Sequence, residues 1–196
     1  MQIPLTREAW LLFAVHALAP IFQEKGYSVP RVRVSCAIPS TSRRGSAVGQ
    51  CWASGHSGDG VNEIFVSPVH ADPLDVLDTL THELVHAVDN CKNRHGKEFK
   101  KIAMVVGLEG KMISASAGPV LKARLASIAA ELTAQWGPYP HAPMRVPSAL
   151  YAAPKPAPRA ACPVCGFRVS MLKKYLEVGP PICPKDMLPM EKKGDW

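Results

Sequence analysis

Near the N-terminus the apolar residues recur with a helical period. The pattern predicts a helix from Arg7 to about Lys25, with Thr6 as its N-cap and Pro20 as a point where it kinks or ends. A secretory signal needs a net positive charge before its apolar run, and here Arg7 is followed at once by Glu8. We therefore expect a capped helix rather than a signal peptide.

Three short segments then carry the pattern of strands. Residues 31–36 alternate polar and apolar side chains, which predicts a strand with one solvated face. Residues 47–53 and 63–67 are two further strand candidates, and residues 54–60 between them have the composition of a loop. We expect a small sheet of about three strands.

The following segment has strong helix boundaries. Asp72 suits the N-cap, Pro73 suits the first helical position, and the helix should end near Asn90. Five apolar residues at helical spacing predict its buried face: Leu74, Leu77, Leu80, Leu84 and Val88. Residues 98–106 and 119–136 predict two more helices. Strands followed by helices indicate an α+β fold, without the alternation of a parallel βαβ protein.

The composition changes after residue 137. Seven prolines fall between residues 138 and 161, and proline–alanine-rich sequence favours an extended linker. This predicts a main domain over residues 1–137, a linker over 138–161 and a small C-terminal module over 162–196.

Charge and cysteine content indicate which partners and which compartment suit the protein. The formal net charge is +7 and the pI is about 9.2, which favours association with nucleic acid or another polyanion. No apolar run has the length of a membrane span. The six cysteines do not form the spacing of a disulfide framework, and this suits a reducing cytoplasm.

The pentapeptide His82-Glu83-Leu84-Val85-His86 is an H-E-x-x-H pattern within the helix of residues 72–90. Its spacing puts both imidazoles on one helical face, where they can bind one zinc ion. Glu83 is then placed to act as the general base that takes a proton from water during attack on a peptide carbonyl. The two histidines also avoid the leucine face, which argues against a purely structural role.

A catalytic zinc usually has three protein ligands, so a third must follow the helix. The polar stretch of residues 90–94 can turn the chain back, and His95 is the expected third ligand. Glu98 is the alternative, because other zinc peptidases use a glutamate. Asp89 is better suited to orienting a ligand histidine by a hydrogen bond to the ring nitrogen that does not bind the metal.

A second cluster lies in the last fifth of the chain. Cys162 and Cys165 have zinc-knuckle spacing, and Cys183 follows after seventeen intervening residues. The spacing is that of a four-cysteine zinc ribbon, except that Asp186 occupies the fourth ligand position. Zinc accepts a carboxylate oxygen, so a structural Cys₃Asp site is expected, weaker than one with four cysteines; the alternative is a degenerate ribbon without metal.

The C-terminal module is also basic. Its candidate nucleic-acid-binding residues are Arg168, Lys173, Lys174 and Lys185, with Phe167 and Tyr175 as stacking surfaces. A solvated basic surface without a ligand is the alternative interpretation.

Taken together, these motifs resemble the SprT-like family of zinc metallopeptidases, in its bacterial and phage form. The likeness spans most of the chain. Its main elements are Gly49 to Trp52, Glu63 to Pro68, Leu77 to His86, and His95 to Lys100, with Gly107 to Met112 and the C-terminal cysteines. The His-Gly-x-x-Phe element at His95 is the most specific part, and it favours His95 over Glu98.

The resemblance implies a minimal zincin-like metalloprotease domain followed by a zinc-ribbon-like segment. It implies a catalytic zinc on three histidines and cleavage of proteins crosslinked to or tightly bound on DNA, with DNA promoting the activity. The alternative is a DNA- or RNA-binding protein that uses the zincin fold as a scaffold with little turnover. For the group that stabilises the oxyanion, chemistry alone leaves three candidates: Lys111, Tyr139 and Tyr151.

Overall fold

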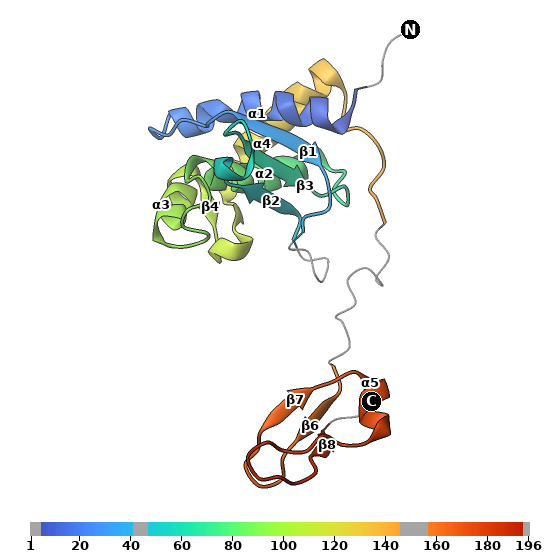
Figure 1. Ribbon diagram of the computed structural model, residues 1–196. Coiled ribbons are helices and arrows are strands. Elements are labelled where there is room, and N and C mark those ends of the chain that lie inside the picture. Colours follow the sequence, from blue (N-terminus) through green and yellow to red (C-terminus); the bar gives the residue numbers. More distant parts are fainter. Residues whose placement is uncertain (1–4, 41–46, 146–156, 194–196) are drawn as a thin grey trace. The chain divides into compact units, whose positions relative to one another are not determined.

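The computed structural model describes residues 5–40, 47–145 and 157–193. The chain divides into two compact units, an N-terminal unit of residues 1–152 and a C-terminal unit of residues 153–196 (Figure 1). Both ends of the segment 138–161 take part in these units: Tyr139 is buried in the N-terminal core, and Arg159 begins a strand of the C-terminal unit.

The first helix, α1 (Arg7–Gln23), begins at the predicted cap, because Thr6 Oγ1 accepts a hydrogen bond from the Ala9 amide at 3.2 Å. Pro20 does not end the helix, which continues for three residues beyond it. Ile21 and Phe22 lie in that last turn and are buried in the core. Packing of these apolar side chains therefore holds the turn in place despite the missing proline N–H.

A three-stranded sheet lies next to α1. It consists of β1 (Val32–Cys36), β2 (Gly49–Trp52) and β3 (Asn62–Val66) in the order β1-β3-β2, with β1 parallel and β2 antiparallel to β3. Alternate residues of β3 are buried, so one sheet face packs on helices. Strand β2 is an edge strand with one side free for a further strand.

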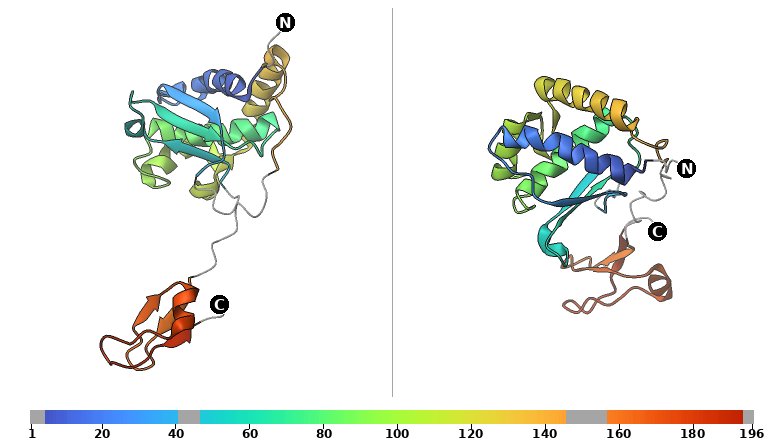
Figure 2. Two further views of the ribbon diagram at one scale, coloured as in Figure 1. Left: turned by 45° about the vertical axis from the view of Figure 1, so that its right-hand side comes forward. Right: turned by 90° about the horizontal axis from the view of Figure 1, so that it is seen from above.

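Three more helices complete this unit: α2 (Pro73–Val88), α3 (Lys97–Val106) and α4 (Pro119–Trp136). Helices α1 and α2 pack on the sheet, and α4 packs on both of them from the other side (Figure 2). Of the predicted buried face of α2, Leu77, Leu80 and Leu84 are fully buried, while Leu74 and Val88 are partly buried at its ends.

A small hairpin, absent from the sequence prediction, follows α3. Its strands β4 (Leu108–Glu109) and β5 (Ser116–Ala117) are antiparallel and enclose the short 3₁₀ helix η2 (Met112–Ser114). Another 3₁₀ helix, η1 (Ser54–His56), lies in the predicted loop between β2 and β3. The hairpin strands are too short to show a period in the sequence.

The C-terminal unit has its own antiparallel sheet, in the order β7-β6-β8. The strands are β6 (Arg159–Ala161), β7 (Arg168–Ser170) and β8 (Glu191–Lys193), and the short helix α5 (Lys173–Val178) follows β7. Its buried cluster contains only Ala160, Cys162, Leu176, Cys183 and Met190. So small a core needs a metal or a covalent crosslink for stability.

The predicted α+β class is confirmed, with small sheets packed on helices. Among the described residues, no helix has both the length and the apolar character needed to cross a membrane.

Candidate metal centres and active-site cavity

His82 and His86 lie one turn apart on α2 and point away from the buried leucine face. Their ring centroids are 5.3 Å apart, and both side chains line a cavity of about 860 Å³. A cavity of this size is in the range that holds a ligand. The helix therefore presents two imidazoles to the same space, as their spacing predicts.

The loop after α2 reverses the chain through unusual backbone conformations. Asn90, Cys91 and Arg94 all have positive φ angles, between 47° and 56°. Such a conformation is unfavourable for residues other than glycine and persists only where the surroundings impose it. This loop is therefore held in its shape by specific contacts.

Two polar side chains supply those contacts. Asp89 accepts hydrogen bonds from the Asn93 amide at 2.8 Å and from Asn93 Nδ2 at 2.7 Å. Asn90 Oδ1 accepts from the Ser54 amide at 2.9 Å and from Asn62 Nδ2 at 3.0 Å. The role expected for Asp89, orientation of a ligand histidine, is thus replaced by a role in shaping the loop.

The loop brings His95 back to the two histidines of α2. His95 Nε2 lies 3.3 Å from Nε2 of His82 and 3.1 Å from Nε2 of His86. One nitrogen from each of the three rings lies within 4.8 Å of the others, so the group can hold a metal ion. Glu98, the alternative third ligand, is exposed on α3 and lies outside this group.

The spacing of the three nitrogens suits ligation of a metal ion better than direct hydrogen bonds between the rings. His95 Nε2 carries at most one proton, so it cannot hydrogen-bond well to both neighbours. Nitrogens bound to a tetrahedral zinc at about 2.0–2.1 Å are about 3.3 Å apart, close to both measured distances. A cation at the centre would satisfy all three lone pairs at once.

The ring of Phe99 packs against all three imidazoles of this group. It is fully buried in the first turns of α3, and its ring centroid lies 5.1, 4.3 and 5.0 Å from those of His82, His86 and His95. The His-Gly-x-x-Phe element therefore has a physical meaning, because the same short segment supplies one imidazole and the surface on which all three pack.

His82 is fixed in one tautomer by the hairpin. Its Nδ1 lies 3.2 Å from the carbonyl oxygen of Ala115 and donates to it, which leaves Nε2 as the lone-pair nitrogen. Asp78, one turn earlier on α2, accepts from the Ala117 amide at 2.7 Å and ties β5 to the helix. No sequence pattern marked Asp78, because its partner is a backbone amide.

Burial keeps the three imidazoles neutral. Desolvation lowers the pKa of His82 to about 4 and is also the main cause that lowers the pKa of His86 to about 3. It lowers the pKa of His95 as well. The neutral ring is the form that binds a metal ion, so the site is ready for binding at neutral pH.

Glu83 lines the same cavity but is nearly completely buried, at 6% exposure. Burial raises the pKa of its carboxyl group to about 8 in the metal-free protein. A Cβ atom at Gly49 would lie 2.4 Å from Glu83 Oε1, so only glycine leaves room for this side chain. Gly49 belongs to a segment that carries the family resemblance, but its role in making room for Glu83 was not predicted from the sequence.

Of the three candidates for an oxyanion-stabilising group, the two that the structure describes lie outside the cavity lining. Tyr139 packs edge-on against Trp10 in the core, and neither Tyr139 nor Lys111 lines the cavity. Tyr151 lies outside the described residues. Arg94 is the guanidinium that lines the cavity, a position its sequence context did not indicate.

The second group of ligand atoms lies in the C-terminal unit. The Sγ atoms of Cys162 and Cys183 lie 3.1 and 3.6 Å from Asp186 Oδ2, and the Sγ atoms of Cys165 and Cys183 are 3.5 Å apart. All four ligand atoms lie within 4.8 Å of one another, so this group also can hold a metal ion.

Two turns of the same design carry these ligands. The Cys162 amide donates to the Phe167 carbonyl at 2.9 Å, and the Cys183 amide donates to the Leu188 carbonyl at 2.8 Å. The fifth residue of each turn, Gly166 or Met187, has a positive φ. Asp186 therefore stands where the first turn has its second cysteine. The thiols of Cys165 and Cys162 donate to this carboxylate and lower its pKa.

The four candidate nucleic-acid-binding residues are exposed on the C-terminal unit but differ in their contacts. Lys173 pairs with Glu177 at 3.6 Å, and Lys174 Nζ lies 4.8 Å from the ring centroid of Tyr175. Arg168 lies on β7, and Lys185 lies in the turn before Asp186. The predicted stacking residues Phe167 and Tyr175 are about half exposed, at 48% and 53%.

Metal content tests the two ligand groups separately. Purified protein loaded with zinc should contain two ions per chain by elemental analysis, and His95→Ala and Cys162→Ser should each lose one. Glu98→Gln is the matched control and should keep both, because Glu98 points away from the imidazoles. A loss in Glu98→Gln with none in His95→Ala would restore the rejected ligand.

Proton release on metal binding tests the burial of Glu83. At about pH 6.5 the buried imidazoles are neutral, whereas the Glu83 carboxyl, with its pKa raised to about 8, is protonated. A divalent cation lowers the pKa of a nearby carboxyl, so zinc should expel this proton. Calorimetry in two buffers should show about one proton fewer released by Glu83→Gln than by wild type, since the C-terminal site contributes equally to both. Equal release would mean that Glu83 is already ionised.

Comparison of the chain with models of known protein families, with curated proteins and with solved structures finds no match. The function therefore has to be argued from the two ligand groups, the cavity and the charge of the molecule.

Proposed function

We propose that the protein is a zinc-dependent endopeptidase of the SprT-like type that cleaves proteins bound on or crosslinked to DNA. The observation that carries this proposal is the combination, in one cavity, of three converging imidazoles with a buried glutamate adjacent to the first of them. The N-terminal unit would then be a minimal zincin domain, and the C-terminal unit a zinc-ribbon-like module with a structural zinc on Cys162, Cys165, Cys183 and Asp186.

The side chains around the cavity have distinct tasks in this reaction. His82, His86 and His95 would hold the zinc, which when bound supplies a Lewis acid and makes water more acidic. Glu83 accepts the proton of the attacking water at its carboxylate and passes it to the leaving amine. Its burial excludes bulk water and favours proton transfer near neutral pH.

Strand β2 supports a peptide as the substrate. Residues 47–51 line one side of the cavity, and β2 is an edge strand that pairs with a strand on one side only among the described residues. An extended peptide can add to an edge strand through main-chain hydrogen bonds. Its scissile bond would then lie near Glu83, which touches β2 at Gly49.

Basic charge supports DNA as the partner that brings the enzyme to its substrate. The chain carries a net charge of +7, and the C-terminal unit combines exposed Arg168 and Lys185 with the half-exposed rings of Phe167 and Tyr175. Cations and stacking rings together are typical of surfaces that bind nucleic acid.

Replacing the general base tests the proposed reaction directly. Glu83→Gln should keep both zinc ions and DNA affinity, and should lose cleavage of a DNA-binding protein by at least about a hundredfold, because the amide cannot accept the proton. Cleavage is followed by gel electrophoresis with and without DNA, and Glu98→Gln serves as the control that stays active. Cleavage by Glu83→Gln at the wild-type rate would rule out the assigned base. A wild type that binds zinc and DNA but never cleaves would favour the scaffold alternative.

A single methyl group on β2 gives an independent test of the site. Gly49→Ala places a Cβ atom against the Glu83 carboxyl group and Thr79, so the carboxyl must move. We expect zinc content to be retained and kcat to fall about tenfold to a hundredfold, since a displaced base loses its alignment. Gly55→Ala is the matched control, because nothing lies within 4 Å of a Cβ atom there. Unchanged kcat in Gly49→Ala would mean that Glu83 works from another position.

A further inference from the structure

A group of unpaired cations surrounds the loop and helix that complete the histidine site. Residues 91–111 contain six basic and two acidic side chains. We call the six the basic face: Lys92, Arg94, Lys97, Lys100, Lys101 and Lys111. All six are exposed, and within the described part of the chain none lies at ion-pair distance from a carboxylate.

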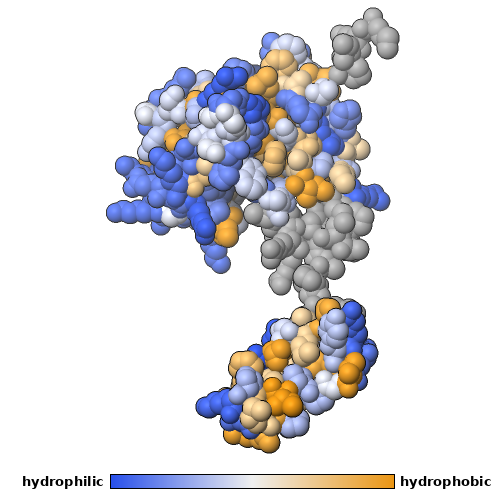
Figure 3. Space-filling view, in the orientation of Figure 1, coloured by the Kyte–Doolittle hydropathy of each residue, from blue (hydrophilic) through white to orange (hydrophobic). Residues whose placement is uncertain are grey.

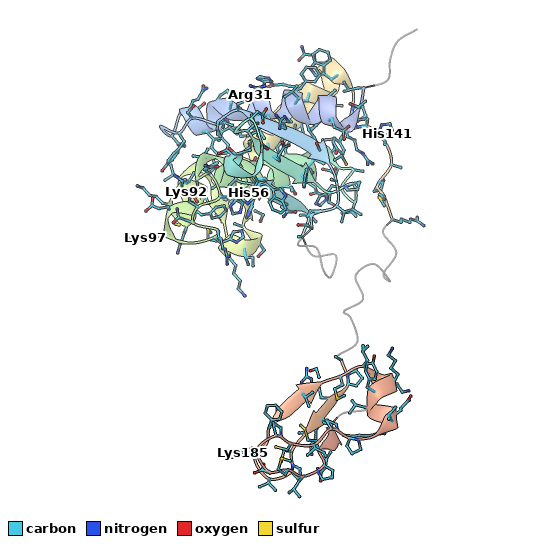
Figure 4. All side chains as sticks on the ribbon, in the orientation of Figure 1. Arg31, His56, Lys92, Lys97, His141 and Lys185 are labelled. Carbon is cyan, nitrogen blue, oxygen red and sulfur yellow. The ribbon has the colours of Figure 1, made fainter. Side chains whose placement is uncertain are left out.

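The basic face adjoins the cavity. Lys92 and Arg94 belong to the loop that carries His95, and Arg94 itself lines the cavity. Lys111 directly precedes η2, whose Ile113 and Ser114 also line it. Figure 4 shows Lys92 and Lys97 extending from one corner of the N-terminal unit, and Figure 3 shows hydrophilic side chains gathered at that corner.

Helix α3 presents three of these lysines on its solvent side. Lys97, Lys100 and Lys101 are spaced three and four residues apart, so they share one face, opposite the buried Phe99 and Ile102. The helix thus turns its apolar side to the imidazoles and its cationic side outward. A ligand held on the cationic side would lie one helix diameter from the metal site.

The stability of α3 does not explain these lysines. A helix N-terminus carries partial positive charge, so cations in the first turn are unfavourable at low salt. Lys97 is the first residue of α3, and Gly96 at the N-cap contributes no side-chain hydrogen bond. An anion bound at this end would offset both the repulsion among the lysines and the uncapped amides.

We propose that the basic face binds the phosphate backbone of nucleic acid, so that the strand runs along the edge of the histidine cavity. Five of its six cations are lysines, which are depleted in protein–protein interfaces but suit the sequence-independent neutralisation of phosphates. The single sign of charge and the lack of ion pairs favour a polyanion over a mixed protein surface.

This surface deepens the proposed function, and its consequence for cleavage rests on that function. The C-terminal unit carries a second basic surface joined to the N-terminal unit by one chain segment. When two linked surfaces bind one nucleic-acid strand, the first contact raises the effective concentration for the second contact. Their joint affinity therefore exceeds that of either surface alone. A protein bound on the same strand would then lie next to the cavity, and DNA would promote its cleavage.

Salt dependence of DNA binding tests the proposal in the full-length protein. The variant with Lys97→Gln, Lys100→Gln and Lys101→Gln should bind a short DNA at least about tenfold more weakly than wild type at low salt. The slope of log K against log salt, measured by fluorescence anisotropy between about 50 and 200 mM, should flatten by about 2–3, one contact for each lysine. An unchanged slope overturns the proposal.

A matched variant separates the basic face from net charge. Lys25→Gln, Arg31→Gln and Arg145→Gln together remove the same charge from exposed positions in other segments of the N-terminal unit, none of which lines the cavity. This control should change the slope by less than about 1. If both triple variants weaken DNA binding equally, only overall charge matters and the proposal fails. If the α3 variant loses binding to polyglutamate but keeps DNA binding, the face belongs to an acidic protein instead.

The readouts keep this proposal distinct from the proposed function. Both triple variants should hold two zinc ions, which shows that the site is intact. A flattened slope in a protein that never cleaves would support the basic face and reject the peptidase. DNA-promoted cleavage with an unchanged slope in the α3 variant would support the peptidase and reject the basic face.

Discussion

Three imidazole nitrogens that lie within 4.8 Å of one another are the constraint on which this structure depends. The Nε2 atoms of His82 and His86 lie 3.3 and 3.1 Å from that of His95, which carries at most one proton and so cannot hydrogen-bond well to both, and burial disfavours the charged form of the rings. The protein meets this constraint with rigid supports rather than with direct hydrogen bonds between the rings. Phe99 supports all three rings, and the Ala115 carbonyl fixes the tautomer of His82.

The same constraint explains the loop between α2 and α3. His95 has to return to the helix within nine residues of His86, and three left-handed residues make that reversal. Their unfavourable backbone is held by Asn90, which reaches across to the Ser54 amide and to Asn62 at the start of β3. The sheet therefore supports the position of His95 through one asparagine, so that a change far from the histidines in sequence can disturb them.

Glu83 shows how the sheet shapes the cavity as well as the scaffold. Its carboxyl group is buried between α2 and the edge strand β2, in space left by the missing side chain of Gly49. Burial is what separates this carboxyl from an ordinary surface glutamate such as Glu98, which is three residues from His95 but is exposed and does not line this cavity. The C-terminal unit depends more on a bound ion for its stability, because its buried cluster of five residues gives little stability by itself.

Local patterns determined much of this protein, and tertiary structure decided the rest. The caps at Thr6 and Asp72, the leucine face of α2, and the spacing of His82 with His86 were all readable from the sequence, because each depends on residues within one or two turns. The grouping of Asp186 with the three cysteines was predicted too, because the spacing of Cys183 and Asp186 repeats that of Cys162 and Cys165. The choice between an end and a continuation of α1 at Pro20, the hairpin that orients His82, and the fit of Gly49 to Glu83 were not. Each of these depends on contacts between residues far apart in the chain, often through backbone groups that every residue shares, and no local pattern records them.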